Sequence, residues 1–389
     1  MNAKLFDGVP EGGIRLLVAV DLGTSALKVA YLPVRPNQLG GSRDAAIQDL
    51  FLPRQTAAQI SAKHVIDSLK LTLYSGPPFA RLQKSIQAKL DEIPLSRDAA
   101  LTGYLHDITA AVASSAKAEA ARLYAKDEGA IEIQWLLPLP ESWNASTKIE
   151  MAAIARISGM GNVQILSEPL CCAALLRRLP DVFGGDDAVL VVDLGRSTGQ
   201  FCALAGNSSV NEKQYIAATN QPQGALLTTV VGQAEAYPCG SASVDRMCMG
   251  YIRRKADDMY GPGGFNKMCA RCGLSEDMGE KEVLKAVGSA RRHFDGKTGD
   301  FVHIEGDRGE AIHLELPSAL IAEFFAPALA LISASIKNQF QRVPAIKGIL
   351  VLGEFGNSPY VKAQIASHYA TKCVTFGWQD TVEAISPNS

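Results

Sequence analysis

The sequence lacks an excess of charge of either sign and has no long uninterrupted apolar run. Its 38 lysines and arginines balance 40 aspartates and glutamates, for a formal net charge of −2. That balance gives no electrostatic case for binding nucleic acid or an anionic membrane surface. No apolar run reaches the roughly 18 residues that span a bilayer, and no basic segment followed by an apolar one opens the chain. These absences predict a cytoplasmic protein without a membrane or nucleic-acid partner.

Signatures of metals and disulfides are also sparse. Eight cysteines in 389 residues do not make a disulfide scaffold. Cys269 and Cys272 form one CxxC, but no second CxxC or close Cys/His pair completes a zinc site, so two partly buried thiols are expected. The six histidines are scattered. The basic pair Arg291 and Arg292 is interpreted as a solvated helix face.

Strand and helix patterns alternate along the chain, which favours an α/β architecture. Residues 98–127 are rich in alanine, with leucine and isoleucine at helical spacing, and predict a long helix. IEIQWLLPLP predicts a buried strand after it. Asn144 or Ser146 is expected to cap the next helix, and VQILSEP predicts a short strand.

The most specific pattern occurs twice. LLVAVDLGTSALKVAYLPV, from position 16, is a run of strand-forming residues broken by Asp-Leu-Gly. AVLVVDLGRSTGQFCALAG, from position 188, repeats the arrangement. Asp and Gly are unfavourable inside a strand, so each copy predicts a strand, a tight turn and a returning strand. Two copies about half a chain apart are more informative than one aspartate–glycine turn.

Such a turn has the chemistry to hold a phosphate. Glycine lets the backbone approach a ligand closely, and successive turn amides can form an anion-binding concavity. An aspartate at the strand end supplies hard oxygen for Mg²⁺. Two facing hairpins could therefore hold the phosphates of a nucleotide, with the metal neutralising charge. Two unrelated hairpin turns are the alternative.

With these residues in view, the sequence resembles the ATPase superfamily of actin, sugar kinases and heat-shock chaperones. LLVAVDLGTSALKVAYL is similar to its first phosphate motif, AVLVVDLGRSTGQF to its second, and KGILVLGEFGNSPYVKAQI to its adenosine motif. The three motifs occur in the right order and span nearly the whole chain. The resemblance implies a two-lobed actin-like fold of duplicated ribonuclease H-like domains. A nucleotide cleft would lie between lobe I (1–185) and lobe II (186–389).

Within the superfamily, the sequence most resembles the nucleotide-binding domain of the seventy-kilodalton heat-shock chaperones, especially their divergent fungal-type relatives. Glu168 and Pro169 match the chaperone segment E-P-x-A-A-A, and ASVDRMCMGYI matches a later segment through Asp245 and Arg246. KEVLKAVGSARRHF resembles the adenosine-contacting helix E-x-x-K-R-x-x-S, and FGNSPYV follows the adenosine turn. We expect no counterpart of the chaperones' peptide-binding domain.

The resemblance assigns roles to individual residues. Asp21 and Asp193 are expected to hold Mg²⁺ through water, and Glu168 to position the metal-bound or attacking water, so these three are the catalytic candidates. The nucleotide-binding candidates are Gly23, Thr24 and Ser25 in the first loop, Gly195, Arg196, Ser197 and Thr198 in the second, Glu282, Lys285 and Ser289 on the helix, and Gly353, Glu354 and Gly356 in the adenosine turn.

Departures from the family pattern indicate slow hydrolysis or none. The second loop reads DLGRST where the chaperones have D-x-G-G-G-T, and Arg196 could donate to a phosphate or obstruct the pocket. Ala286 stands where the helix should carry arginine, and Glu354 replaces a glycine of the turn. No residue clearly matches the catalytic lysine, for which Lys84 and Lys89 are the candidates.

The sequence thus predicts an actin-like domain that binds ATP or ADP with Mg²⁺, and an ATP hydrolase if it is active. Its role would be chaperone-like or that of a scaffold, toward client or partner proteins. A small-molecule kinase of the same superfamily is one alternative, although no aspartate base facing an acceptor pocket and no sugar-recognition segment are evident. A pseudo-ATPase that binds partners and no nucleotide is the other.

Overall fold

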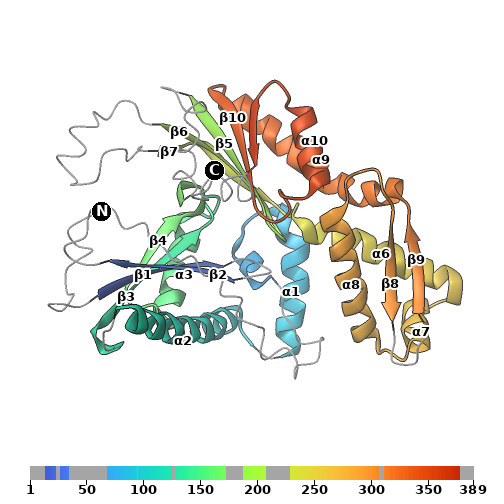
Figure 1. Ribbon diagram of the computed structural model, residues 1–389, viewed down its shortest axis with the longest axis horizontal. Coiled ribbons are helices and arrows are strands. Elements are labelled where there is room, and N and C mark those ends of the chain that lie inside the picture. The colour runs from blue at the N-terminus through green and yellow to red at the C-terminus, as the bar shows by residue number, and fades with distance from the viewer. Residues whose placement is uncertain are drawn as a thin grey trace. The chain divides into compact units, whose positions relative to one another are not determined.

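The computed structural model describes residues 14–22, 27–34, 68–93, 95–124, 128–171, 187–206, 228–305 and 311–376. It has the mixed α/β architecture that the alternating patterns predict (Figure 1). The chain divides into two compact units. The first is centred on Ile66–Asp187 with the N-terminal strands, and the second on Ala188–Ala203 and Gly232–Ser389.

The first unit is built on a four-stranded sheet of order β2-β1-β3-β4. β1 (Ile14–Leu22) pairs antiparallel with β2 (Leu27–Val34) and parallel with β3 (Ile131–Leu139), and β3 pairs parallel with β4 (Val163–Ser167). Leu16, Leu17 and Val18 are all buried, so both faces of β1 are covered, as is usual for a strand with parallel neighbours. The helices are α1 (Ala80–Glu92), α2 (Arg97–Tyr124) and α3 (Ala145–Ile157), with short 3-10 helices η3 (Leu69–Leu73), η4 (Pro77–Phe79) and η5 (Glu128–Ala130).

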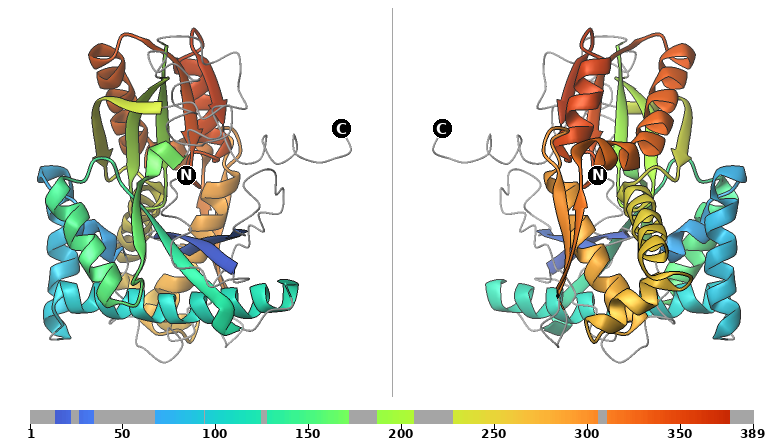
Figure 2. Two further views of the ribbon diagram at one scale, coloured as in Figure 1. Left: turned by 90° about the vertical axis from the view of Figure 1, so that its left-hand side faces the viewer. Right: turned by 90° about the vertical axis from the view of Figure 1, so that its right-hand side faces the viewer.

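The second unit contains a five-stranded sheet of order β11-β10-β5-β6-β7. Its strands are β5 (Ala188–Leu194), β6 (Gly199–Gly206), β7 (Thr228–Tyr237), β10 (Ile346–Leu352) and β11 (Cys373–Phe376), with β10 parallel to both β5 and β11. Helices α9 (Ser318–Arg342) and α10 (Pro359–His368) accompany the sheet. A separate group is formed by α6 (Ser241–Tyr260), α7 (Gly264–Arg271), α8 (Glu276–His293) and the hairpin β8 (Asp300–Glu305) with β9 (Ala311–Leu316) (Figures 1 and 2).

The two sheets share one plan. The order β2-β1-β3-β4 in the first corresponds to β6-β5-β10-β11 in the second. In each sheet a strand ending in Asp-Leu turns back, after four residues, into its neighbour, and the last two strands are parallel and joined through a helix. These helices are α3 and α10. The plan places the two Asp-Leu-Gly patterns at equivalent positions.

Local signals in the sequence predict several of these elements correctly. The long helix expected over 98–127 is α2, and IEIQWLLPLP forms β3. Asn144 is the N-cap of α3, where its side chain accepts a hydrogen bond from the Thr147 amide at 2.8 Å. VQILS forms β4, and the chain becomes helical at Glu168 and is described as far as Cys171.

One described helix, α9, is long and apolar enough to cross a membrane by length and composition alone. The helix is not an uninterrupted apolar run, since Glu323 and several serines lie within it, but its mean hydropathy passes the test. Phe325, Ile332 and Ile336 are nevertheless buried inside the second unit, where α9 packs against α6. In all, 39% of its apolar window is buried within the protein.

Candidate functional site

The first Asp-Leu-Gly pattern forms the predicted hairpin. β1 continues through Asp21 to Leu22, and the chain then returns as β2, antiparallel to β1. Asp21 is therefore the penultimate residue of β1, and Leu22 separates it from the turn. Its side chain is outside the described part of the structure, so its metal role stays a prediction. The same holds for the phosphate roles of the turn residues Gly23, Thr24 and Ser25.

Asp21 and Glu168 belong to the same edge of the four-stranded sheet. β1, β3 and β4 are parallel, with Ala19 level with Leu136 and Leu139 level with Ser167, so their carboxyl ends align. Glu168 directly follows β4, two strands from β1. Two strand spacings of about 4.8 Å and an offset of two residues along the strands separate the backbones of Asp21 and Glu168 by about 12 Å. This is the edge at which open α/β sheets bind ligands.

A lysine that the sequence did not indicate lies against Glu168. Lys70 Nζ is 2.7 Å from Glu168 Oε1, and the two side chains are only 13% and 14% exposed. The Lys70 ammonium is also 5.7 Å from the centre of the Trp143 ring. Lys84 and Lys89, the sequence candidates for a catalytic lysine, lie on α1. Lys70 is in η3, 98 residues from Glu168, so no local pattern could have identified the pair.

The second Asp-Leu-Gly pattern is described in full and also forms the predicted turn. β5 ends at Leu194, β6 begins at Gly199, and the Gly195 amide donates to the Thr198 carbonyl at 2.9 Å. Gly195, Arg196 and Thr198 are partly exposed. Ser197 is buried, so its hydroxyl presents little surface to a phosphate.

The carbonyls of this turn cap helix α6. Ser241 N–H donates to the Gly195 carbonyl at 3.1 Å, and Ala242 N–H donates to the Arg196 carbonyl at 2.7 Å. The first four amides of a helix have no partner within it, and here the turn carbonyls accept from the first two. A Cβ at Gly240 would lie 2.4 Å from the Arg196 oxygen, so only glycine permits this approach. The path of the second loop is thereby fixed by α6.

The predicted adenosine turn packs on the end of β5. Phe355 N–H donates to the Leu194 carbonyl at 2.9 Å. Gly353 has φ +85°, and a Cβ there would lie 2.4 Å from the Leu194 oxygen and 2.6 Å from Asp193 Oδ1. Gly356 is equally restricted, since its Cβ would approach a backbone oxygen to 2.4 Å. The structure thus brings Asp193, the second loop and the glycine turn together at the carboxyl edge of one sheet.

Four alternating charges connect the second loop to the glycine turn, and we call them the Arg196–Glu354 ion chain. Arg196 Nη1 is 3.3 Å from Asp245 Oδ2, Asp245 Oδ1 is 2.9 Å from Arg291 Nε, and Arg291 Nη2 is 3.3 Å from Glu354 Oε1. The central Asp245 and Arg291 side chains are 6% and 2% exposed, whereas the terminal Arg196 and Glu354 are 34% and 43% exposed. Two positive and two negative groups leave the chain of charges neutral.

This arrangement corrects one expectation and extends another. Arg291 was expected on a solvated helix face and is instead among the most buried polar residues of the second unit. Arg291 also places an arginine of α8 beside the glycine turn. The resemblance expects an arginine of this helix at position 286, where the chain has alanine. Arg196 and Glu354 occupy two of the positions at which the resemblance places glycines, and the structure connects both in a single network. The sequence separations of 49, 46 and 63 residues explain why no motif predicted it.

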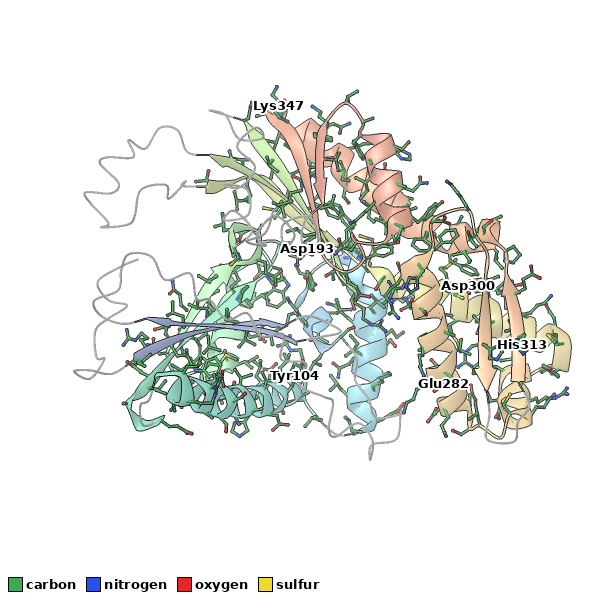
Figure 3. All side chains as sticks on the ribbon, in the orientation of Figure 1. Tyr104, Asp193, Glu282, Asp300, His313 and Lys347 are labelled. Carbon is green, nitrogen blue, oxygen red and sulfur yellow. The ribbon has the colours of Figure 1, made fainter. Side chains whose placement is uncertain are left out.

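The predicted adenosine residues of α8 lie on another face of that helix. Lys285 Nζ is 3.7 Å from Glu282 Oε2, and Lys285 and Ser289 are exposed. At 3.6 residues per turn, Arg291 points about 180° away from Glu282 and lies about 13 Å further along the axis. In Figure 3, Glu282 lies well apart from Asp193. The α8 side chain that reaches the glycine turn is therefore Arg291.

The cysteines of the second unit whose side chains the structure describes are all buried. Burial raises the pKa of Cys239 to about 12 and that of Cys269 to about 11. Cys269 and Cys272 are both fully buried, so the CxxC consists of two core thiols, more enclosed than expected. In the part of the chain that the structure describes, no group of three His, Cys, Asp or Glu side chains could hold a metal ion.

A magnesium ion bound with a nucleotide needs fewer protein ligands than such a group. Mg²⁺ commonly takes one or two carboxylates and completes its shell with water and phosphate oxygens. Asp193 is a partly buried carboxylate at the end of β5, with Oδ1 beside Gly353, and suits this chemistry. Glu168 is paired with the Lys70 ammonium, whose positive charge disfavours a metal ion beside it.

No protein-family model matches the sequence, and no curated protein matches it significantly. The functional assignment therefore rests on the residues and their geometry.

Proposed function

We propose that the protein is a two-lobed actin-like ATPase that binds ATP or ADP with Mg²⁺ in a cleft between its lobes. The observation that carries the proposal is the shared plan of the two sheets, each with an Asp-Leu-Gly turn at the equivalent strand end. A phosphate-binding turn is needed on each side of a nucleotide in this superfamily, and the duplication would supply the pair. The glycine turn after β10, packed on β5, supports a nucleoside site beside the second loop.

The sequence resemblance to the nucleotide-binding domain of the seventy-kilodalton heat-shock chaperones supports the same assignment. In that role the protein would act on client or partner proteins in the cytoplasm, as a chaperone-like component or a scaffold. Mg²⁺, when bound, would neutralise phosphate charge, and Asp21 and Asp193 are the carboxylates that would hold it through water.

Lys70 is our candidate for the catalytic lysine that the resemblance implies. Its ammonium is fixed by Glu168 at 2.7 Å and by the face of Trp143, in a position of low exposure. A cation held in this way needs little reorganisation to stabilise charge that develops on a phosphate. Glu168, in turn, is the residue to which the resemblance assigns the orientation of water.

We further propose that hydrolysis is slow or absent. Phosphoryl transfer depends on groups placed close to the phosphates. Arg196 stands where a glycine amide would approach and is held by Asp245, and Ser197 is buried. The same two substitutions favour a second candidate, a pseudo-ATPase that binds partners and no nucleotide.

Isothermal titration with ATP and ADP, with and without Mg²⁺, followed by a phosphate-release assay, tests these proposals. We expect Mg²⁺-sensitive binding that Asp21→Ala weakens. We expect Lys70→Ala to lower phosphate release much more than ATP affinity. Lys84→Ala, an exposed lysine on α1, is the matched control and should change neither. No heat and no thermal shift at millimolar nucleotide would contradict nucleotide binding and favour the pseudo-ATPase.

The double change Arg196→Gly with Ser197→Gly addresses the rate. If these side chains hold the phosphates away from the turn amides, turnover should rise in the double variant. A clear fall would show that Arg196 itself stabilises the transition state, as an arginine finger does.

A further inference from the structure

Glu354 is the exposed carboxylate end of the Arg196–Glu354 ion chain. It lies in the turn between β10 and α10, next to Gly353, at the carboxyl edge of the second sheet. Arg291 contacts its Oε1 at 3.3 Å, and the side chain is 43% exposed. Among the described residues, Oε2 has no partner. Because Arg291 is 2% exposed and held by Asp245, it can fix the carboxylate while leaving one oxygen toward solvent.

The two ends of the ion chain differ in what they can bind. A carboxylate only accepts hydrogen bonds, whereas a guanidinium only donates them. Glu354 would repel a phosphate and favour an uncharged donor, while Arg196 would favour an anion. A ligand suited to both ends has an anionic group at one end and hydroxyl or amino donors at the other. A nucleotide has this polarity.

Ribose hydroxyls are the donors that this position suits best. In dinucleotide-binding sheets, an acidic residue accepts a hydrogen bond from the ribose 2′-hydroxyl. Glu354 similarly follows a parallel strand of an α/β sheet, beside a glycine that allows close backbone approach. The exocyclic amine of adenine shares the donor chemistry and is the alternative to be separated by experiment.

We infer that Glu354 recognises the ribose of a bound nucleotide and that Arg291 and Asp245 are positioning residues for its carboxylate. The inference rests on the proposed nucleotide function and deepens it. It assigns a role to a side chain that replaces a family glycine.

Isothermal titration of the full chain with ATP, 2′-deoxy-ATP and inosine triphosphate tests the inference. Wild type should bind ATP about 10- to 100-fold more tightly than 2′-deoxy-ATP, the size expected for one hydrogen bond to a charged group. Glu354→Ala should lower ATP affinity to that of 2′-deoxy-ATP and leave 2′-deoxy-ATP affinity unchanged. Glu323→Ala, an exposed glutamate on α9, is the control and should retain the wild-type ratio.

Two further variants test whether the loss of affinity in Glu354→Ala comes from the missing carboxylate rather than from unfolding. Glu354→Gln keeps an oxygen to accept from Arg291 and should reduce the ratio of affinities part-way. Asp245→Asn, which loosens Arg291, should also reduce it.

The outcomes separate this inference from the proposed function. If wild type binds ATP and 2′-deoxy-ATP with the same affinity, and Glu354→Ala does too, the ribose inference is overturned, whereas the proposal of nucleotide binding is retained. Discrimination against inosine triphosphate alone would assign Glu354 to the base amine and overturn the ribose assignment. Absence of any nucleotide binding would overturn both.

Discussion

Replacing Asp245 with asparagine should destabilise the protein by about 3 kcal/mol, because it removes the central charge of the Arg196–Glu354 ion chain. Asp245 and Arg291 are both nearly inaccessible, and Asp245 Oδ1 is 2.9 Å from Arg291 Nε. Without the carboxylate, the negative charge that remains beside Arg291 among the described residues is that of the exposed Glu354, at 3.3 Å. A buried guanidinium would then lack its main counter-charge.

The magnitude follows from the two contacts that Asp245 makes. Removing one partner of a buried ion pair costs about 3–5 kcal/mol, and asparagine retains an oxygen to accept from Arg291, so the lower limit applies. The contact with Arg196 adds less than about 1 kcal/mol, because that side chain is one-third exposed and screened by solvent. For a domain of this size, about 3 kcal/mol corresponds to a fall in Tm of roughly 6–12 °C.

Urea unfolding followed by circular dichroism measures the effect. Asp258→Asn, an exposed aspartate on the same helix, is the matched control and should change stability by less than about 0.5 kcal/mol. The double change Asp245→Leu with Arg291→Met should cost less than Asp245→Asn, since apolar replacement of a whole buried pair is often neutral. Equal unfolding midpoints for Asp245→Asn and Asp258→Asn would refute the reasoning.

Three further results are expected. Gly353→Ala should cost on the order of 3 kcal/mol in thermal unfolding, from its positive φ and the approach of a Cβ to the Leu194 oxygen and Asp193 Oδ1; an unchanged Tm would show that the turn yields easily. Burial raises the pKa of Cys239 from about 9 to about 12. Its contribution to stability is therefore complete below about pH 9 and falls by up to about 1.4 kcal/mol per pH unit between pH 9 and 12. Urea midpoints at pH 8 and 10 should differ less in Cys239→Ala than in wild type. The sequence resemblance predicts that Lys285→Ala weakens adenosine binding measured by titration, whereas the structure, in which Arg291 rather than Lys285 contacts the glycine turn, predicts wild-type affinity.

The sequence by itself determined the local architecture. Each predicted feature follows from residues that are close together in the sequence. Helical periodicity predicts α2, a capping residue predicts the start of α3 at Asn144, and turn-forming glycines predict both Asp-Leu-Gly hairpins. The repeat of the Asp-Leu-Gly pattern also indicated that the second half of the chain reuses the plan of the first, and the order of strands in the two sheets agrees.

Only the tertiary structure decided which side chains meet at the candidate site. Lys70 and Glu168 are 98 residues apart, and the partners of the Arg196–Glu354 ion chain are separated by 46 to 63 residues. Long-range ion pairs leave no periodic trace in a sequence, because either partner could equally be a solvated surface charge. Burial distinguishes the two cases: folding removes Arg291 from water, and a carboxylate must then accompany it. That requirement, set by how α6, α8 and the glycine turn pack together, selected Asp245 and Glu354.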